Sequence, residues 1–452
     1  MDLYAELVQR ALYPIWEGTI RRRPTLDLLR YLEQTQFRPL EDIEALQLGS
    51  LRRLLRHSYD HVPFYRARMD AAGMKPEDVR SLSDLRRLPV LDRAEVRASV
   101  ATRVSTAPPL PTITKTTSGS SGEPLQISYD RGSENWRQAT KLRGYGWAGH
   151  RVGVKTVHYW GLAPLPKGFK GTKIVADRRL RQERWFDCNV RSERELSALA
   201  TELERDPPAV LVSFSQAAAD LARFVNAKGA RRWPDIHVIC AAEKLFPHDR
   251  EEIVKAFGPQ VFETYGSREV MLIAAECEAH DGLHLSMENL LVELVVRDGE
   301  RERPAEEGET GEIVVTDLHN YGSPLVRYAS GDLAVSRGRG RCTCGRSLLR
   351  IGPIEGRVTE TLIDAEGGRV SGLMFVVAFV AKGQSVRGFQ VVQHRDRAVT
   401  VRVACDELPA RTEADLRAFM TPHLRGLPIR FERVDAIALD RSGKRRQVVV
   451  ER

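Results

Sequence analysis

The middle of the chain alternates between short apolar runs and helical patterns, and this alternation strongly limits the folds open to it. The run "AVLVSF" from Ala209 precedes "SQAAADLARFVNAKG", which has helical spacing and ends on Gly229. The strand-like runs "IHVICA" and "QVFETYG" follow, separated by the helical segment "PHDREEIVKAFG". Strands joined by helices form parallel sheets, so an α/β fold with a mostly parallel sheet is predicted from about 114 to 335. Shorter strands with glycine turns are predicted for "LLVELVV", "TGEIVVTDL" and "DLAVS".

Two regions with different patterns flank this segment. Residues 1–103 carry apolar side chains at three- and four-residue spacing, as from Leu46 to Leu55, and predict helices. After Gly356 the pattern restarts as strand, helix and strand in "AVTVRVAC", "RTEADLRAFMTPHLRG" and "IRFERVDAI". A chain of 452 residues is too long for one core. We therefore expect a large N-terminal α/β lobe with mixed or parallel sheets, residues 1–355, and a small α+β C-terminal domain, residues 356–452.

Charge and cysteine usage exclude several classes of protein. The net charge of +8 is mild for this length, and the basic clusters are not interleaved with aromatic residues, so nucleic-acid binding is not expected. The longest apolar run, "LMFVVAFVA" from Leu373, is too short to span a membrane. The N-terminus has the pattern of an amphipathic helix and lacks the basic start and cleavage site of a signal peptide. Six sparse cysteines predict free thiols and a cytoplasmic location.

A segment rich in glycine and hydroxyl side chains, "TTSGSSGEP" from Thr116, precedes the predicted strands. Its glycines let the backbone turn sharply, and its Ser and Thr residues supply donors, so this loop is able to wrap the oxygens of a polyphosphate. The G-K-[ST] end of a Walker loop is missing. Taken alone, such a segment is more often an ordinary surface loop, and the interpretation depends on the other motifs.

Five segments, in this order, resemble the adenylate-forming superfamily of acyl-CoA synthetases and related ligases. They are the loop above, "ETYGSREV" from Glu263, "RYASGDLAV" from Arg327, "IEGRVTETLI" from Ile354 and "LDRSGKRRQVV" from Leu439. The stretch "RHSYDHVPFYRARMDAAGMKPEDVRSLSDLRRLPVLDR" is similar to the N-terminal signature of the phenylacetate–CoA ligase group. The resemblance extends from about residue 51 to residue 444.

The resemblance implies a two-step reaction. A carboxylate attacks the α-phosphorus of ATP to give an acyl-adenylate and pyrophosphate, and a thiol, most often that of coenzyme A, then displaces AMP. Because two anions must approach each other, such a site needs donors and cations fixed around the phosphates. A carrier-protein phosphopantetheine, an amine or a hydroxyl is an alternative acceptor, and a nucleotide-binding relative without turnover is a third interpretation. The expected ligands are ATP, Mg²⁺, coenzyme A and a small carboxylic acid, and the chain would be a monomer or a homodimer.

The resemblance also implies roles for individual residues. The β- and γ-phosphates would be held by the loop residues Thr117, Ser118, Gly119, Ser120, Ser121 and Gly122. The nucleotide would further contact Tyr265 at adenine, Gly266 and Ser267 at base and phosphate, Asp332 at the ribose hydroxyls, and Ala242 and Glu243 at the border with the acyl pocket. The catalytic set would be Glu269 as the Mg²⁺ ligand, Arg357 at the ribose or phosphate, and Lys444 at the α-phosphate. Singly, each has a plainer alternative: Tyr265 as core, Asp332 as a turn cap, Lys444 as a solvated cation.

Three departures from the family pattern bear on turnover. Glu123 stands where the loop commonly carries Lys, which removes a cation beside the triphosphate. Thr359 stands at the hinge position, where Asp or Lys is common. Arg268 stands where Thr usually precedes the Mg²⁺ ligand, and we expect its charge to compensate for Glu123.

A cysteine and histidine cluster predicts a second metal. Cys277 and His280 have C-x2-H spacing, and Cys342 and Cys344 form C-x-C in a Gly/Arg-rich stretch with little core of its own. Three thiolates and one imidazole match a closed structural Zn²⁺ site, which leaves no open position for substrate. His284 is a rival fourth ligand, and unligated thiols are the plainer alternative. Some members of the phenylacetate–CoA ligase group look similar here and carry zinc.

The sequence says least about the acyl group. The stretches from Val154 to Pro166 and from Leu211 to Gln216 lie where the resembling family builds its acyl pocket. The candidate lining residues are His158, Tyr159, Trp160 and Phe214. Aromatic residues there would suit an aryl or medium-sized apolar acid, yet the same residues are equally good core.

Overall fold

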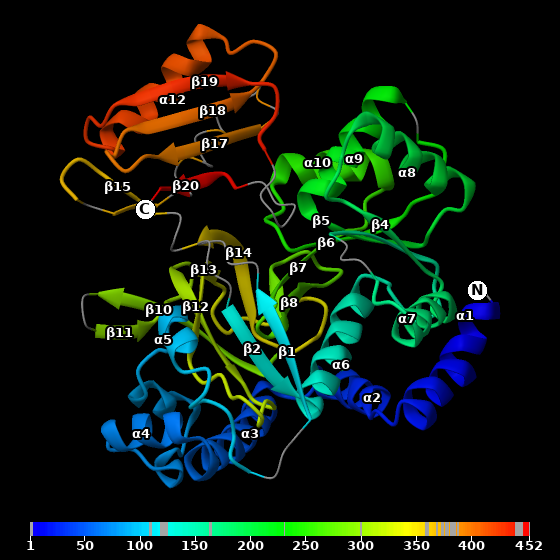
Figure 1. The fold of residues 1–452 in the computed structure, drawn as a ribbon, viewed down its shortest axis with the longest axis vertical. Coiled ribbons are helices and arrows are strands. Elements are labelled where there is room, and N and C mark those ends of the chain that lie inside the picture. Colours follow the sequence, from blue (N-terminus) through cyan, green and yellow to red (C-terminus); the bar gives the residue numbers. More distant parts are fainter. Residues whose placement is uncertain are drawn as a thin grey trace. The chain divides into compact units, whose positions relative to one another are not determined.

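The computed structural model divides the chain into two compact units, residues 1–330 with 334–353, and residues 331–333 with 354–452 (Figure 1). The residues that it describes are 3–107, 111–117, 125–161, 165–229, 231–298, 301–357, 361–367, 369–371, 375, 379, 386, 388–438 and 446–451. The expected α/β class is confirmed, with one large mixed sheet in the first unit and a small sheet with a helix in the second.

The N-terminal part of the first unit is helical. Its elements are α1 (Leu3–Leu7), the π-helical turns η1 (Val8–Leu12) and η2 (Ile15–Ile20), α2 (Thr25–Thr35), α3 (Leu40–His61), α4 (Pro63–Ala71), the 3₁₀ turns η3 (Pro76–Asp78) and η4 (Leu82–Arg87), and α5 (Arg93–Ala98). Helix α4 begins at Pro63, where the missing N–H costs no hydrogen bond. Helix α5 begins after Asp92, whose carboxylate accepts from the Glu95 N–H at 2.7 Å.

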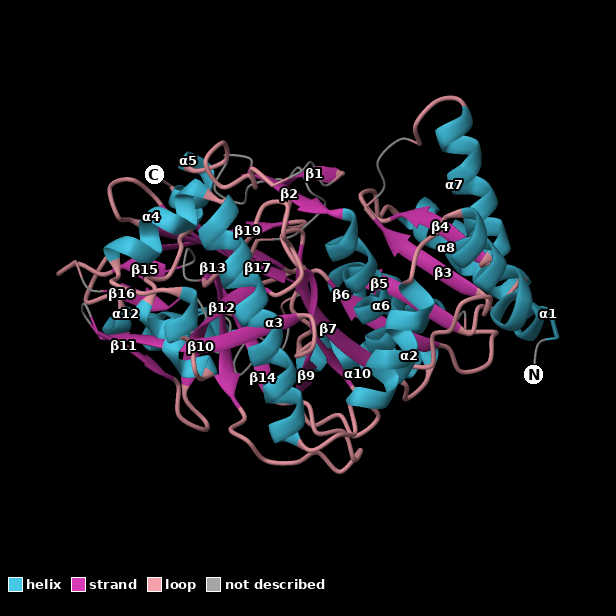
Figure 2. Cartoon of the chain, turned by 90° about the horizontal axis from the view of Figure 1, so that it is seen from below, coloured by secondary structure: helices cyan, strands magenta, loops and turns pink. Residues whose placement is uncertain are grey.

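The predicted alternation forms a parallel block within the large sheet. Its elements are β3 (Thr156–Trp160), α7 (Phe169–Leu180), β4 (Glu183–Asp187), α8 (Glu193–Arg205), β5 (Val210–Phe214), α9 (Ser215–Lys228), β6 (His237–Ala241), α10 (Pro247–Phe257) and β7 (Val261–Ser267). The strand order β4-β3-β5-β6-β7 is parallel throughout. Helix α9 ends at Gly229, whose φ of 57° only glycine adopts without strain. Figure 2 shows this block with α6, α7 and α8 around it.

Antiparallel strands complete the twelve-stranded sheet. They are β8 (Met271–Glu276), β9 (Leu283–Leu285), β10 (Leu290–Asp298), β11 (Arg301–Pro304), β12 (Thr310–Asp317), β13 (Tyr328–Ser336) and β14 (Arg350–Arg357), in the order β11-β10-β12-β13-β14-β9-β8-β7. A separate hairpin pairs β1 (Thr112–Thr117) with β2 (Leu125–Asp130). The three shorter predicted strands correspond to β10, β12 and β13.

The two faces of the parallel block pack against different helices. Residues of α8, α9 and α10 form one core with Val157 and Leu211 on the strands. Helix α6 (Arg131–Trp147) covers the other face, where Tyr145 packs with Val212 and Ile239. A Cβ at Gly144 of α6 would lie 2.5 Å from Leu272 of β8, so this glycine permits the close approach. Two buried ion pairs, Arg137–Asp317 at 2.6 Å and Arg143–Glu288 at 2.7 Å, also fix α6.

The second unit matches the strand, helix and strand pattern predicted for it. Its elements are β15 (Thr361–Ile363), β16 (Arg369–Ser371), β17 (Gly388–Gln393), β18 (Val399–Ala404), α12 (Ala410–His423), β19 (Ile429–Val434) and β20 (Val448–Val450). Its four-stranded sheet has the order β19-β18-β17-β20, in which β18 and β19 run parallel on either side of α12 in the sequence. Across both units, the helices in the described part of the chain include none with the length and apolarity to cross a membrane.

Candidate functional site

The β1–β2 hairpin carries the expected phosphate loop. Pairing runs in register from Thr112 opposite Asp130 to Thr117 opposite Leu125. The loop residues Ser118, Gly119, Ser120, Ser121 and Gly122, together with Glu123, lie outside the described residues, as does the side chain of Thr117. On β1, the Lys115 ammonium lies 5.0 Å from the ring centroid of the buried Tyr129.

Asp130, at the base of the hairpin, was not singled out by its sequence. Its Oδ1 accepts from the Ser133 N–H at 2.9 Å and so caps α6. Its Oδ2 accepts from the backbone N–H groups of Tyr321 at 2.8 Å and Gly322 at 2.9 Å. One carboxylate therefore joins the hairpin, the first turn of α6 and the loop that follows β12.

The "ETYGSREV" motif forms the end of β7 and the turn into β8. The register between the two strands shifts at Tyr265 and Gly266, a bulge that re-aims the side chains that follow it. Tyr265 is 7% exposed, and its hydroxyl lies 3.4 Å from Ser330 Oγ on β13. Ser330 precedes Asp332 by two residues on the same strand. Tyr265 of the "ETYGSREV" motif thus contacts β13, the strand that carries Asp332 of the "RYASGDLAV" motif.

The same turn reaches the phosphate-loop hairpin through Arg268. Its Nη1 donates to the carbonyl oxygen of Thr116 at 3.0 Å. Thr116 is the second-last residue of β1, next to the start of the glycine-rich loop. The Arg268 guanidinium is therefore held against β1, the strand that leads into the glycine-rich loop.

Glu269 is buried beside groups that sequence reasoning missed. It is 6% exposed, and its Oε1 lies 3.5 Å from both Arg93 Nη1 and the Tyr328 hydroxyl. Arg93 begins α5, and Tyr328 begins β13 within the "RYASGDLAV" motif. The only sequence signal for Tyr328 was its place in that motif, and Arg93 had none beyond the N-terminal signature.

A substitution at Gly266 tests how closely the β7–β8 turn is packed. A Cβ built on it would overlap the carbonyl oxygen of Met271, a backbone atom that has no room to move. We expect Gly266→Ala to lower the free energy of unfolding by about 1–3 kcal/mol and to displace Tyr265. Urea denaturation measures the first effect. Gly146→Ala on α6 is the control. Apart from its chain neighbours and the backbone of its own helix, no described atom lies within 4 Å of the methyl group that alanine would add there, so a loss of stability as large as that of Gly266→Ala would contradict the account.

The "CAAEKL" segment follows β6 and is tied to the start of α9. Ala242 has a positive φ of 67°, an uncommon backbone for a non-glycine residue. Glu243 Oε2 accepts from the Gln216 N–H at 3.1 Å, and its carbonyl accepts from Ser215 Oγ at 2.7 Å. Both residues thus lie at the carboxyl ends of parallel strands, where open α/β sheets bind ligands.

The four candidate acyl-pocket residues do not share one face. Trp160, at the end of β3, packs edge-on against Phe214 of β5, with ring centroids 4.6 Å apart. His158 stacks on Trp185 of β4 at 4.0 Å, and burial lowers its pKa. Tyr159 points into the core beneath α8 and α9. Tyr159 and Phe214 both belong to this core and fit the core alternative, and Trp160 packs against it from the end of β3.

The remaining expected residues belong to the second unit or to the segment leading into it. Asp332 is half-buried on β13, directly after Gly331, whose φ is 79°. Arg357 is the last residue of β14, and its side chain is not among those described. Thr359 and Lys444 lie outside the described residues.

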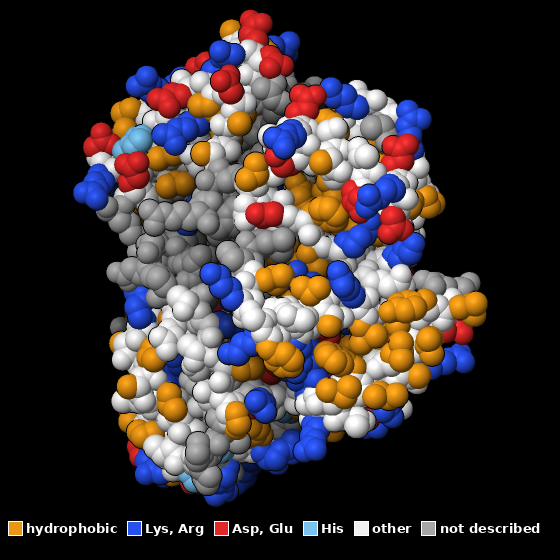
Figure 3. All heavy atoms as spheres, turned by 45° about the vertical axis from the view of Figure 1, so that its right-hand side comes forward, with side chains coloured by type: hydrophobic (Ala, Val, Ile, Leu, Met, Phe, Trp, Pro, Cys, Tyr) orange, Lys and Arg blue, Asp and Glu red, His pale blue; other side chains and the backbone are white. Residues whose placement is uncertain are grey.

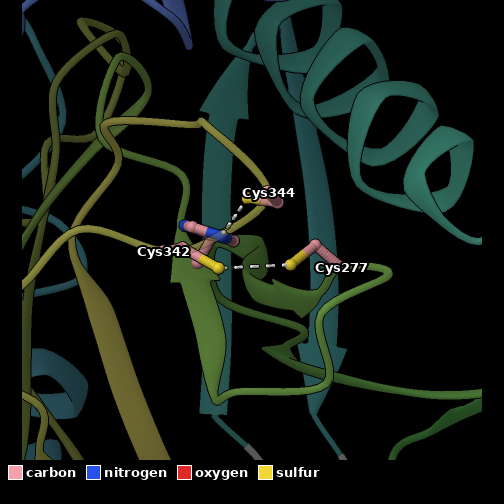
Figure 4. A group of neighbouring side chains, drawn as sticks. Cys277, Cys342 and Cys344 are labelled. Atoms are coloured by element: carbon pink, nitrogen blue, oxygen red, sulfur yellow. Dashed lines mark hydrogen bonds between the residues drawn. The ribbon is translucent and has the colours of Figure 1, made fainter.

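The structure brings three cysteines and one histidine together. Cys277 follows β8, His284 lies in β9, and Cys342 and Cys344 lie between β13 and β14, with all four ligand atoms within 4.8 Å of one another. Cys277 Sγ lies 3.7 Å from Cys342 Sγ, and Cys344 Sγ lies 3.3 Å from His284 Nε2. Figure 4 shows the three cysteine side chains converging.

The chemistry of this cluster fits a metal. His284 Nδ1 lies 3.0 Å from the Leu348 carbonyl, to which it donates, so Nε2 carries the lone pair that faces the thiols. Burial lowers the pKa of His284 to about 4 and raises that of Cys277 to about 12. Burial alone would raise the pKa of Cys344, but hydrogen bonds from Arg346 and the neighbouring thiols outweigh it, and the pKa is lowered. A Cys₃His set of this kind suits Zn²⁺.

His280 is not the histidine that joins the cysteines. Its Nδ1 lies 3.0 Å from Glu276 Oε1, and its ring packs against Phe262 with centroids 4.9 Å apart. The C-x2-H spacing favoured His280, but the chain turns after it, and β9 pairs with β14 so that His284 faces the C-x-C turn. His284, which the sequence offered as the alternative ligand, is the histidine that lies beside the three cysteines.

Sequence comparison finds similar proteins over most of the chain. The chain is 26% identical over 380 residues to the phenylacetate–coenzyme A ligase of Thermus thermophilus, which covers 81% of this chain and 82% of that protein. It is 27% identical over 356 residues to the phenylacetate–coenzyme A ligase of Escherichia coli, with 74% and 75% covered. No protein-family model matches the chain.

Structure comparison gives the same fold. A crystal structure of 2-hydroxyisobutyryl-CoA ligase in the postadenylation state superposes with a TM-score of 0.73 and 21% identity, over 93% of this chain and 92% of that one. The resemblance stated from the five motifs and the α/β fold expected from the alternation of strands and helices are both confirmed.

Proposed function

We propose that this chain is an AMP-forming acid–thiol ligase. Its sequence is related to the phenylacetate–coenzyme A ligases, and its fold is that of adenylate-forming ligases. In this reaction a carboxylate oxygen attacks the α-phosphorus of ATP, and the bond to pyrophosphate breaks. The thiol of coenzyme A then attacks the acyl carbonyl, loses its proton and expels AMP.

One observation carries this proposal. The contact between Arg268 Nη1 and the Thr116 carbonyl holds the "ETYGSREV" turn against the hairpin of the glycine-rich loop. From the same turn, Tyr265 reaches Ser330 and Glu269 reaches Tyr328, both on β13. Motifs from three distant parts of the sequence therefore meet around one β7–β8 turn, as a shared nucleotide site requires.

The proposed roles follow from this arrangement. Backbone N–H and hydroxyl groups of the loop from Thr117 to Gly122 bind the outer phosphates, with Arg268 as the nearby cation. Tyr265 packs against adenine, beside the segment of Ala242 and Glu243, and Asp332 accepts from the ribose hydroxyls. Arg357 and Lys444 complete the charge around the phosphates.

The Glu269 carboxylate fits a Mg²⁺ site, because Mg²⁺ binds through one or two carboxylates together with substrate phosphates. Its neighbour Arg93 would share this carboxylate with the ion. Bound Mg²⁺ would neutralise phosphate oxygens as negative charge moves to the leaving pyrophosphate. Zn²⁺ held by Cys277, His284, Cys342 and Cys344 is proposed as structural, since the four protein ligands fill a tetrahedral site.

The positive charge of Arg268 is expected to compensate for the cation that Glu123 removes from the glycine-rich loop. We expect Arg268→Ala to raise the KM for ATP by roughly fivefold or more, because a charge-assisted contact to phosphate contributes about 1–3 kcal/mol. Steady-state kinetics with varied ATP measures this. Arg268→Lys is the matched variant and should retain most of the ATP affinity, whereas an unchanged KM in Arg268→Ala would refute the compensation.

The identity of the acceptor is a separate part of the proposal. Nucleotide-binding motifs are shared by enzymes that transfer the acyl group to coenzyme A, a carrier-protein thiol, an amine or a hydroxyl. Pyrophosphate exchange with a panel of carboxylic acids tests adenylation without any acceptor, and AMP release with each acceptor then identifies the second step. Exchange with none of the acids would favour a nucleotide-binding protein without turnover.

The boundary at residues 355 and 356 and a mobile C-terminal domain are also proposed. That domain would deliver Lys444 for adenylation and then rotate about Thr359 for thioester formation. None of the six cysteines forms a disulfide in the described structure, which fits the reducing cytoplasm that we propose as the location.

A further inference from the structure

The outer surface of the N-terminal helices has no role in the proposed ligase chemistry. Residues 3–20 form a nearly continuous helical segment through α1, η1 and η2. Leu3, Leu7 and Ile15 point outward at four-residue multiples, and they are 83%, 51% and 53% exposed. A folded chain normally buries such a stripe, because each exposed aliphatic side chain forfeits hydrophobic free energy.

Helix α7 extends this apolar surface. Tyr4 donates to the Leu180 carbonyl at 3.2 Å, and Trp16 Nε1 donates to Asp177 Oδ1 at 2.8 Å, so the last turn of α7 lies against residues 3–20. Phe169, the first residue of α7, is 83% exposed, one turn from Lys173, whose ammonium lies 5.9 Å from the Trp16 ring. We call the outward side of residues 3–23 and 165–181, which includes α7, the N-terminal face. Figure 3 shows a broad hydrophobic area on the side where these helices lie.

The exposed charges of the N-terminal face have one sign. Within residues 3–23 and 165–181, the exposed charged side chains are all basic: Arg10, Arg22, Lys167, Lys170, Lys173 and Arg179. Of the acidic residues in these ranges, Glu17 and Asp177 are buried and Glu6 is half-buried. Glu17 and Asp177 are buried in ion pairs with Arg21, and Glu6 lines a separate pocket with Arg151 and Lys155.

We propose that the N-terminal face docks on an anionic lipid surface. Aliphatic and aromatic side chains on an outward helical stripe, with Lys and Arg around them, have the composition of helices that lie in the membrane interface. Each basic side chain near the headgroups adds an attraction to anionic lipid. Phe169 protrudes from the start of α7, a shape that enters a lipid interface more readily than it matches a flat protein surface.

A second copy of the chain fits this face less well. Two copies meeting here would bring their lysines and arginines together without carboxylates to pair them, and like charges at an interface oppose association. An anionic bilayer supplies the negative charge that the face lacks.

Vesicle binding tests the proposal without any turnover, so its outcome is independent of the ligase assignment. The full chain is sedimented with phosphatidylcholine vesicles, with and without about 30% phosphatidylglycerol, at low salt and at about 0.5 M NaCl. We expect the partition coefficient on anionic vesicles to exceed that on neutral vesicles at least about tenfold, and high salt to reduce it. The double variant Leu7→Glu, Phe169→Glu and the triple variant Lys167→Ala, Lys170→Ala, Lys173→Ala should each bind at least about tenfold more weakly.

Val190→Glu is the matched control, because Val190 is 57% exposed in the loop between β4 and α8, outside the N-terminal face. It should bind like the unchanged chain, and thermal melting shows whether every variant is folded. Equal binding to both kinds of vesicle, or binding to neither, overturns the proposal. So does a dimer, detected by light scattering, that the Leu7→Glu, Phe169→Glu variant dissociates, since the face would then belong to a second copy.

Discussion

Lys444→Ala is expected to abolish acyl-adenylate formation while leaving thioester formation from a supplied acyl-adenylate. In the proposed mechanism, the Lys444 ammonium offsets the negative charge that gathers when a carboxylate approaches the α-phosphate. Removing one preorganised donor to such a transition state typically costs a factor of about 10² to 10³ in rate. The second half-reaction starts from an adenylate already made, and its leaving group is AMP, so this lysine has no comparable part in it.

The two half-reactions are measured separately, the first by pyrophosphate exchange and the second by thioester formation from synthetic acyl-adenylate and coenzyme A. Arg445→Ala is the matched control, because it removes the adjacent positive charge and leaves Lys444 in place. Equal losses in both half-reactions would show that Lys444 acts through folding or general binding. An effect of Arg445→Ala as large as that of Lys444→Ala would assign the role to the local charge.

His284→Ala is expected to release the proposed Zn²⁺, whereas His280→Ala should retain it. His284 Nε2 faces the three thiols, while His280 is paired with Glu276 away from them. Loss of an outer-shell partner alone weakens metal binding about 10- to 100-fold, so loss of a direct ligand should cost at least about 100-fold, or roughly 2.7 kcal/mol. Because the metal would hold the turn containing Cys342 and Cys344, this cost should appear as lost folding stability.

Metal content after dialysis against a chelator, and melting temperature with and without that chelator, provide the measurements. The two histidines make a matched pair, since they are four residues apart on the same segment. Zinc retained in His284→Ala and lost in His280→Ala would reverse the assignment. A chain purified without zinc, with a melting temperature insensitive to the chelator, would reject the metal site itself.

The sequence was most informative where structure depends on local patterns. Strand β5, helix α9 and strand β6 follow from apolar runs, helical spacing and the terminal Gly229, all of which are read within a few residues. The parallel pairing then follows from the connections, because a helix between two strands permits little else. Family resemblance supplied the segments around Tyr265 and Asp332, but not their neighbours in space.

Contacts between distant segments could not be read in the same way. Nothing in the spacing places Arg93 of α5 beside Glu269, because that contact depends on how α5 meets the sheet. The choice between His280 and His284 depends on the chain turning at Gly282, whose φ is 81°, and on β9 pairing with β14. Both histidines have a plausible spacing from Cys277, and only the pairing of strands separates them.

The three hydrogen bonds accepted by Asp130 have a consequence for how this enzyme class can diversify. They anchor the hairpin at the end where Thr112 pairs with Asp130, whereas the glycine-rich segment joins the strands at the opposite end, after Thr117 and before Leu125. Exchange of the loop sequence between these strand ends, the glutamate for a lysine included, would leave all three of these hydrogen bonds in place. A grafted tip from another ligase would need to match only the two strand ends at Thr117 and Leu125.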